Sequence, residues 1–403
     1  MPRTLITGAR VIDGTGAGPA DGDVVIDGTS IVDVGVGLDG DEAIDATGLT
    51  VMPGFIDCHI HALLSSLDTM ANLAMPYSMQ YYLAAENLRK TLDAGITTVR
   101  DASGADLGVQ QAVRRGLIDG PDMHISIIAL SQTGGHGDHW LPSGNHNDVL
   151  SVTPGRPSGI VDGVDECRKR VRELLRNGAD AIKVNTSGGV FSPRDNPAHP
   201  HFTMDELTVM VEEATRGGKY VMAHAHGASG IKNAILAGVR SVEHGTDLDD
   251  EAIELMLKHG TWLVPTLGVG QFIRDRIKAG AAVPAGIVEK AMENERMRAG
   301  SFARAVQAGV NIAMGSDAAA EMHGRNLIEL RLMHEGGLDP AQTLRAGTQR
   351  AAELMRIEDR VGTLRPGMQA DLVLVEGDPY DFGAYPGNVR KVFRQGRLVR
   401  GGA

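Results

Sequence analysis

The middle of the chain alternates short apolar runs with longer stretches of helical periodicity. Segments 165–178 and 203–218 place apolar residues three and four apart, and the second begins with Thr203 and Glu206 at capping-box spacing. Short apolar runs that end in polar or turn residues are typical of buried strands. Eight such runs occur, at 52–61, 96–103, 123–131, 180–187, 220–227, 239–245, 261–267 and 310–318. The pattern predicts eight strand–helix units.

Both ends of the chain show a different pattern, in which β-branched residues are interrupted by glycine and aspartate. It covers residues 1–52 and returns after 355 in "ADLVLVEGD" and "VRKVFRQGRLVRGG", where "RQGR" suits a hairpin turn. Neither end can bury a core of its own. We therefore expect the two ends to pair into one small β domain.

These patterns predict an α/β fold: a (β/α)8 TIM barrel with a small β-sandwich domain built from both chain termini. The barrel would span 53–354, and the sandwich would combine 1–52 with 355–403. An open doubly wound sheet is the competing architecture. Its glycine-rich phosphate fingerprint is absent, because "GTGAG" near residue 14 lies in a β-rich segment rather than before a helix.

Composition narrows the partners and the compartment. The 403 residues are 42% hydrophobic and 22% charged, as in ordinary soluble proteins. A net charge of -12 without basic clusters argues against nucleic acid and against anionic membrane surfaces. Two cysteines give no disulfide framework, and neither a signal peptide nor a long apolar run is present. We expect a cytoplasmic protein that acts on a small molecule.

Polar residues interrupt the apolar runs near their ends, where barrel enzymes place their active sites. His59 and His61 stand two apart, so in a strand both point to the same face. An HxH pair alone could equally lie on the wet face of an edge strand. The polar residues at the strand ends are His59, His61, Asp101, Lys183, His224, His244 and Asp317. One or two divalent ions, bound by imidazole and carboxylate ligands, would account for nearly every one of them.

Three of these residues have more than one interpretation. An ammonium at Lys183 would repel a cation, but carboxylation by carbon dioxide would make it a bridging ligand; alternatively it pairs with Glu243. The spacing of His224 and His226 does not decide which one faces the metals. Asp317 could serve as a ligand and base, or only cap the following helix.

The motifs together resemble the amidohydrolase superfamily of metal-dependent hydrolases. "PGFIDCHIH", "GITTVRD", "IKV", "HAHG", "SVEHG" and "GSDA" occur in the family's order, and "GTLRPGMQADLVLVEGDP" leads out of the barrel. "SQTGGHGD" and "NTSGGVFSPRDNP" are similar to the peptidase-like branch. That branch contains Xaa-Pro and Xaa-Arg/Lys dipeptidases, ochratoxin-hydrolysing amidases and phenylurea hydrolases.

The resemblance implies a role for each candidate. Two divalent ions, most often Zn²⁺, would be bound by His59 and His61, by His224 and His244, and by Lys183 as a bridging N6-carboxylysine. Asp317 would bind one ion and shuttle protons, and His136 would contact the scissile carbonyl oxygen. Candidate substrate contacts are His226, His201, His139, His323 and Arg194. The chain departs from its relatives at Phe202, where they often carry tyrosine.

We therefore predict an amidohydrolase that cleaves the amide bond of a dipeptide or N-acyl amino acid with a metal-bridging hydroxide. Alternatives are the hydrolysis of aromatic amides, ureas or carbamates, and a mononuclear imidazolonepropionase-like cyclic amidohydrolase. A metal-free binding protein on the same fold would have lost ligands, whereas every expected ligand position is filled here. The resemblance to this superfamily also implies a homo-oligomer.

Overall fold

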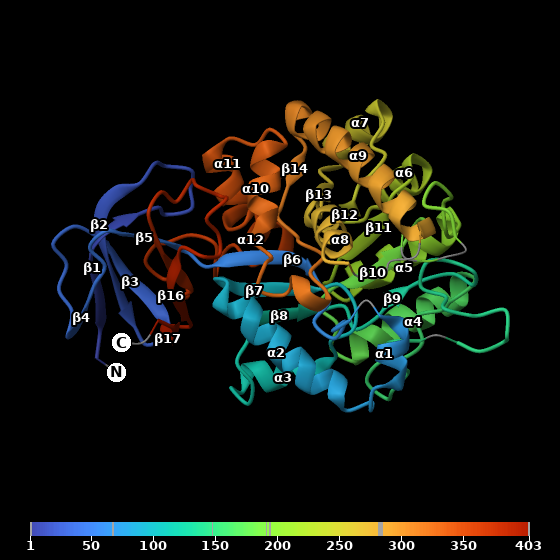
Figure 1. Cartoon of the computed structure of the whole chain (residues 1–403), viewed down its shortest axis with the longest axis horizontal. Coiled ribbons are helices and arrows are strands. Elements are labelled where there is room, and N and C mark those ends of the chain that lie inside the picture. Colours follow the sequence, from blue (N-terminus) through green and yellow to red (C-terminus); the bar gives the residue numbers. More distant parts are fainter. Residues whose placement is uncertain are drawn as a thin grey trace.

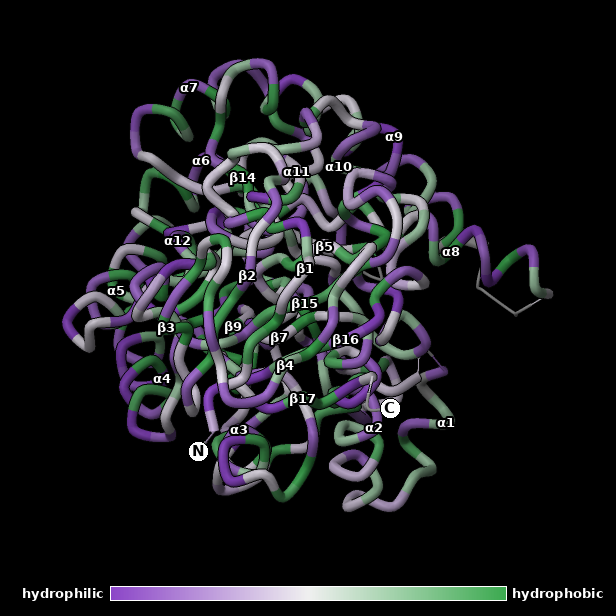
Figure 2. The backbone as a smooth tube through the Cα atoms, turned by 90° about the vertical axis from the view of Figure 1, so that its left-hand side faces the viewer, coloured by the Kyte–Doolittle hydropathy of each residue, from purple (hydrophilic) through white to green (hydrophobic). Residues whose placement is uncertain are grey.

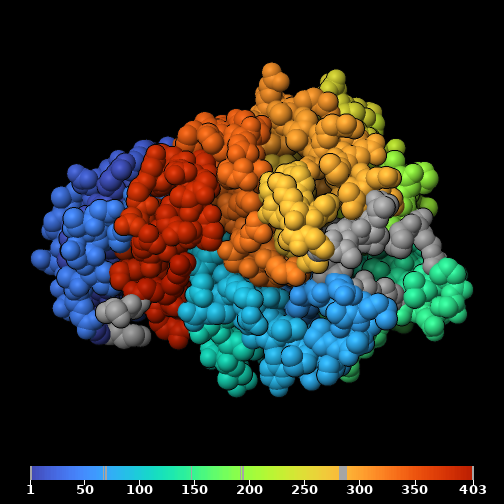
Figure 3. Space-filling view, viewed as in Figure 1, coloured from blue at the N-terminus to red at the C-terminus, as the bar shows by residue number. Residues whose placement is uncertain are grey.

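The computed structural model describes residues 2–66, 68–146, 148–190, 192, 195–280 and 285–401. Strands from the two ends of the chain form one eight-stranded sheet in the order β17-β16-β15-β5-β1-β2-β3, with β4 paired to β1. Figures 1 and 3 show the first and last segments side by side at one end of the molecule. The strands are β1 (Thr4–Val11), β2 (Ala20–Asp27), β3 (Ser30–Gly35), β4 (Glu42–Asp45), β5 (Leu49–Pro53), β15 (Leu372–Glu376), β16 (Val389–Arg394) and β17 (Arg397–Arg400).

The antiparallel ladder between β5 and β15 joins the two ends, from Leu49 opposite Glu376 to Pro53 opposite Leu372. Residues of both ends share one apolar cluster, which includes Ile6, Val24, Ile26, Val51, Leu374 and Phe393. The ends thus bury together what neither could bury alone. Because these ladders form a single sheet, the two-layer sandwich and its boundaries at 52 and 355 stay predictions.

The middle of the chain forms two parallel sheets. One has the order β6-β7-β8 and the other β14-β13-β12-β11-β10-β9. Every pair of neighbours in them is parallel, as strand–helix units require. The strands are β6 (Phe55–Ile60), β7 (Ile96–Asp101), β8 (Asp122–Ile125), β9 (Ala129–Leu130), β10 (Ile182–Asn185), β11 (Val221–Ala225), β12 (Ser241–His244), β13 (Trp262–Val264) and β14 (Asn311–Ile312).

The predicted barrel is found in part, because the ladders of the described residues do not form a closed ring. The third predicted strand splits into β8 and β9 at Ile127, whose φ is +70°; β8 then pairs with β7 and β9 with β10. On the opposite side, Cys58 N donates to Met314 O at 2.9 Å and Asp317 N donates to His59 O at 2.7 Å. Strand β6 therefore contacts the segment that follows β14.

Helices follow most of these strands, and Figure 2 shows hydrophobic and hydrophilic residues alternating along the peripheral ones. The predicted capping box of α5 is present, with Thr203 and Glu206 bonded to each other's backbone. None of the described helices has the length and apolar character to span a membrane. The helices are α1 (Thr69–Ala74), α2 (Met79–Asp93), α3 (Leu107–Arg114), α4 (Val164–Arg176), α5 (Met204–Arg216), α6 (Ala228–Ala237), α7 (Asp250–His259), α8 (Gly268–Lys278), α9 (Ala285–Ala308), α10 (Ile328–Glu335), α11 (Pro340–Ala346) and α12 (Gln349–Met355), with a 3-10 turn at Ala320–Met322.

Candidate metal centre and active site

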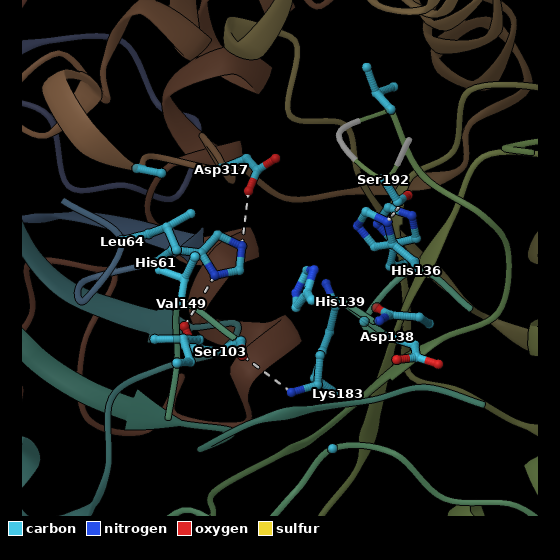
Figure 4. Close-up of a pocket in the computed structure, with 18 of the residues that line it drawn as sticks. His61, Leu64, Ser103, His136, Asp138, His139, Val149, Lys183, Ser192 and Asp317 are labelled. Carbon is cyan, nitrogen blue, oxygen red and sulfur yellow. Dashed lines mark hydrogen bonds and ion pairs between the residues drawn. The ribbon is translucent and has the colours of Figure 1, made fainter. Parts of the chain in front are cut away.

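The carboxyl ends of the parallel strands open into a cavity of about 1200 Å³. Figure 4 shows His61 and Asp317 on one side of it and His136 and Ser192 on the other. The cavity gathers all six predicted ligands, because His59, His61, Lys183, His224, His244 and Asp317 line it.

One group of metal-type donors, meaning imidazole nitrogens and carboxylate oxygens that could bind a metal ion, lies between β6, β12 and the segment after β14. A donor atom from each of His59, His244 and Asp317 lies within 4.8 Å of the others. His61 extends this group, because its Nε2 is 3.1 Å from Asp317 Oδ1. Imidazole nitrogens and a carboxylate oxygen that converge in this way can hold a divalent ion.

A second group consists of His224, His226 and His244, whose donor nitrogens also lie within 4.8 Å of one another. The rings of His224 and His226 have centroids 4.6 Å apart, although the two residues stand two apart in and just after β11. Both therefore reach the cavity. The geometry does not choose between them, and the assignment of His224 as the ligand stays a prediction.

The ring nitrogens that face away from the cavity are held by hydrogen bonds. Such bonds fix the orientation of a ligand histidine and aim its other nitrogen at the metal. The Nδ1 atoms bond to Glu243 Oε2 at 2.7 Å for His59, Ser103 O at 3.2 Å for His61, Thr246 Oγ1 at 2.7 Å for His226 and Thr266 Oγ1 at 2.7 Å for His244.

Glu243 and Arg100 form a buried pair behind these histidines, and neither is exposed to solvent. Arg100 Nη2 donates to both carboxylate oxygens of Glu243, at 2.9 and 3.1 Å, and Arg100 Nε donates to Cys58 O at 2.6 Å. Burial alone would raise the pKa of Glu243, but Arg100 and the His59 hydrogen bond outweigh it and lower that pKa to about 2. The carboxylate therefore stays ionised and orients His59.

Lys183 on β10 is 3% exposed and lines the cavity. Its Nζ makes no hydrogen bond or ion pair with any residue in the described part of the chain, so the alternative pairing with Glu243 is not formed there. Burial is the main cause that lowers the pKa of Lys183 to about 8. A buried amine without a partner facing these donors is compatible with carboxylation.

Two of the ligand positions have strained backbones. His244 has a φ of +72° and Asp317 a φ of +55°, in the left-handed region that residues with a Cβ rarely adopt. Strain of this kind costs about 1–3 kcal/mol per residue and persists where the surrounding structure fixes the conformation, often at functional sites. At both positions it turns the chain where a strand or its extension enters the cavity.

His136 faces the metal-type donors from the loop after β9. Its ring stacks on that of His224 with centroids 4.4 Å apart. Its Nδ1 bonds to Ser192 Oγ at 2.7 Å, and Ser192 in turn donates to Asp195. Gly189 makes room for the ring, because a Cβ there would lie 2.1 Å from His136 Cε1. His136 is therefore held in one orientation by a serine and a carboxylate.

The other predicted substrate contacts divide into two groups. His139 and His226 line the cavity, whereas His201 and His323 are buried and are not among the described lining residues. His323 bonds to His61 O and to Thr91 Oγ1, so it supports the strand end that carries His61. Arg194 lies outside the described residues.

Two buried residues near the strand ends, Asp101 and Arg156, bond to the backbone rather than to groups in the cavity. Asp101 accepts hydrogen bonds from Ala62 N at 2.8 Å and Ala105 N at 3.1 Å and does not line the cavity. Arg156 is buried and donates to Gly104 O and Ser151 O. Both residues tie loops at the strand ends in place.

Sequence reasoning missed the residues that support and complete the site. The sequence suggested Glu243 only as a partner of Lys183, and Arg100 was missed. Glu243 lies on the fully buried strand β12, and a buried carboxylate needs a cationic partner, which was the available signal for Arg100. Asp195, Thr246, Thr266 and Arg298 carried no comparable signal, because their contacts arise only from the tertiary fold.

Known proteins resemble the chain over nearly its whole length. The model of the amidohydrolase family matches residues 50–399. Ochratoxinase from Aspergillus niger is 36% identical over 367 residues, which cover 87% of this chain and 76% of that protein. A crystal structure of a prolidase complexed with N-methylphosphonate-L-proline is 37% identical with a TM-score of 0.91, covering 99% of this chain and 100% of that one. A Xaa-Pro dipeptidase with bound methionine in the active site is 33% identical, with the same TM-score and coverage.

Proposed function

Because this chain belongs to the amidohydrolase family, which confirms the resemblance seen in its sequence, we propose that it is a metal-dependent hydrolase of carboxylic amides. Membership of the family indicates a hydrolase that acts on carbon–nitrogen bonds. The observation that carries the proposal is the convergence of two donor groups, which share His244, on one cavity. The same relatives are named for prolidase, dipeptidase and ochratoxinase activities.

The residues present fit a pair of divalent ions. His59 and His61 with Asp317 would hold one ion, and His224 and His244 the other, with carboxylated Lys183 between them. The bonded outer nitrogens of His59, His61 and His244 support this assignment, because they leave Nε2 of each ring for the cavity. Zinc suits such a donor set. Bound divalent ions supply Lewis-acid chemistry, which activates water and polarises a carbonyl.

The chain's own groups would then orient the substrate and move the protons. Asp317 Oδ1 lies near both His59 Nε2 and His61 Nε2, at 3.4 and 3.1 Å, in the wall of the cavity. Its carboxylate would accept a proton from the attacking water and deliver it to the leaving nitrogen. His136, opposite, has Nδ1 engaged by Ser192 and would offer Nε2 to the carbonyl oxygen.

An N-acyl amino acid or dipeptide is the substrate that we propose first, since the prolidase and dipeptidase relatives are named for such bonds. A bulky aromatic amide is the second candidate. The size of the cavity, about 1200 Å³, and the apolar residues on its walls favour it: Leu64, Ile128, Val149, Leu150, Val152, Ile160, Phe272 and Ile273.

The test is to purify the protein, measure its metal content, and assay dipeptides, N-acyl amino acids, aromatic amides and ureas. We expect amide hydrolysis that a chelator abolishes and zinc restores, with two ions per chain. One ion per chain with an unmodified Lys183 would favour the mononuclear alternative. A metal-replete protein inert toward the whole panel would contradict the proposal.

The homo-oligomer and the cytoplasmic location also stay predictions. Light scattering coupled to size exclusion measures the mass in solution, and more than one chain per particle is the expected result.

A further inference from the structure

A buried guanidinium faces the cavity beside the metal-type donors. Arg298 on α9 is 6% exposed and lines the cavity. Its Nη1 donates to Thr266 O at 2.6 Å and lies 3.2 Å from Thr266 Oγ1. Its Nε is buried without an acceptor, and Nη2 makes no hydrogen bond to the described residues. Much of the donor capacity of this side chain is therefore unused.

No carboxylate in the described part of the chain pairs with Arg298. Three acidic residues on neighbouring parts of the fold have other partners. Glu295, on the same helix, pairs with Arg274. Glu329 accepts from Leu267 N and Gly268 N at 2.8 and 2.7 Å. Asp317 pairs with His61.

An unpaired buried cation is unfavourable unless something compensates its charge. A guanidinium matches a carboxylate in charge and in planar geometry, and the resulting hydrogen bonds are among the strongest in proteins. The cavity is the open side of Arg298, so the compensating anion would come from there. The natural source of such an anion is a ligand.

The position of Arg298 relates this anion site to the reaction. Thr266 Oγ1, which Arg298 contacts, is 2.7 Å from His244 Nδ1. One hydroxyl therefore separates the guanidinium from His244, the histidine that the two groups of metal-type donors share. A carboxylate bound by Arg298 would lie a few atoms from the scissile amide. This is where the α-carboxylate of an N-acyl amino acid stands relative to its own amide nitrogen. Apolar side chains of α8 line the same cavity and suit an apolar amino-acid side chain: Val269, Phe272 and Ile273.

We propose that Arg298 is the receptor for a substrate carboxylate and selects amides of α-amino acids over neutral amides. The inference rests on the proposed amide hydrolysis and deepens it by naming the residue that would recognise the substrate carboxylate. Arg298 acts here as a specificity-determining residue that touches the substrate. The rival role is purely structural, in which Arg298 only positions Thr266 and through it His244.

Binding of L-phenylalanine and L-phenylalaninol tests the proposal, because the two ligands differ only in the carboxylate and neither contains an amide. Calorimetry on the zinc-loaded protein is expected to show L-phenylalanine binding about 10- to 100-fold more tightly, the range of charged hydrogen bonds. Arg298→Met should reduce this preference to within about twofold, and Arg298→Lys should keep part of it. The metal content and melting temperature of each variant are measured alongside.

Two control variants locate the effect. Arg276 on α8 pairs with Glu321 at 2.8 Å and is not among the described lining residues, so Arg276→Met should keep the full preference. Lys290 also lines the cavity, but its Nζ donates to Ser192 O and Asp195 O. Loss of the preference in Lys290→Met rather than Arg298→Met would overturn the assignment.

The proposal is also overturned if the wild type shows no preference, or if Arg298→Met weakens both ligands equally, as a structural role requires. These outcomes differ from failure of the proposed function. An Arg298-dependent preference in a protein that hydrolyses no amide would refute only the hydrolysis. Hydrolysis of neutral and carboxylate-bearing amides alike, unaffected by Arg298→Met, would refute only the carboxylate receptor.

Discussion

Two layers of polar residues meet at the histidines, and they differ in how completely they are paired. Behind the rings, Arg100 and Glu243 are fully buried and satisfy each other. In front of them, Lys183 and Arg298 are almost as deeply buried but have no carboxylate partner among the described residues. The rear layer therefore holds the fold, whereas the front layer presents two buried side chains to the cavity without a carboxylate partner among the described residues.

The largest expected effect comes from the front layer. Lys183→Ala should remove both bound metal and activity, with hydrolysis reduced at least about 10³-fold, because a ligand shared by two ions would be lost. Elemental analysis and amide turnover measure the two losses. Lys219→Ala is the matched control, since Lys219 pairs with Asp180 away from the cavity. Full metal content and turnover in Lys183→Ala would contradict the bridging role.

A substitution in the rear layer should lower the free energy of unfolding. Arg100→Met leaves Glu243 buried beside His59 without its cation, and breaking a buried pair costs about 3–5 kcal/mol. We expect a loss of that size in the free energy of unfolding measured with urea. Arg331→Met, which breaks a partly exposed i, i+4 pair with Glu335, should change it by less than about 1 kcal/mol. Equal losses in the two variants would remove the distinction between the layers.

A smaller effect is expected at His136, which faces the cavity and is held in place by Ser192 and Asp195. Asp195→Asn weakens the hold of Ser192 on His136 and should lower kcat about 10- to 100-fold while metal content stays unchanged. Exposed Asp165→Asn serves as the control. If Asp195→Asn lost metal in proportion to activity, Asp195 would belong with the structural residues.

The smallest effect should come from a site outside both layers. Thr203 caps α5 through a capping box with Glu206, and Thr203→Ala should cost about 1 kcal/mol of unfolding free energy without changing kcat/KM. Urea denaturation and the amide assay check the two parts. A change in kcat/KM would show that α5 influences the cavity, although Thr203 belongs to neither layer.

The predicted ligand histidines line one cavity, because strand ends with period-two spacing converge wherever parallel strands share one edge. His59 and His61 lie side by side for this reason, and so do His224 and His226. Asp101 ends a strand in the same way, yet it binds backbone amides of Ala62 and Ala105 instead. Position along a strand thus restricts the candidates, but it does not fix what a side chain contacts.

By itself the sequence determined which segments form strands and helices and which polar residues stand at the strand ends, because periodicity and spacing are local properties. Only the tertiary structure decided that β8 and β9 split, that Glu243 pairs with Arg100 rather than Lys183, and that Arg298 reaches the cavity. The split depends on how β8 and β9 pair with different neighbouring strands, and the other two outcomes depend on which buried charges find partners. Both are decided by packing between segments far apart in the chain.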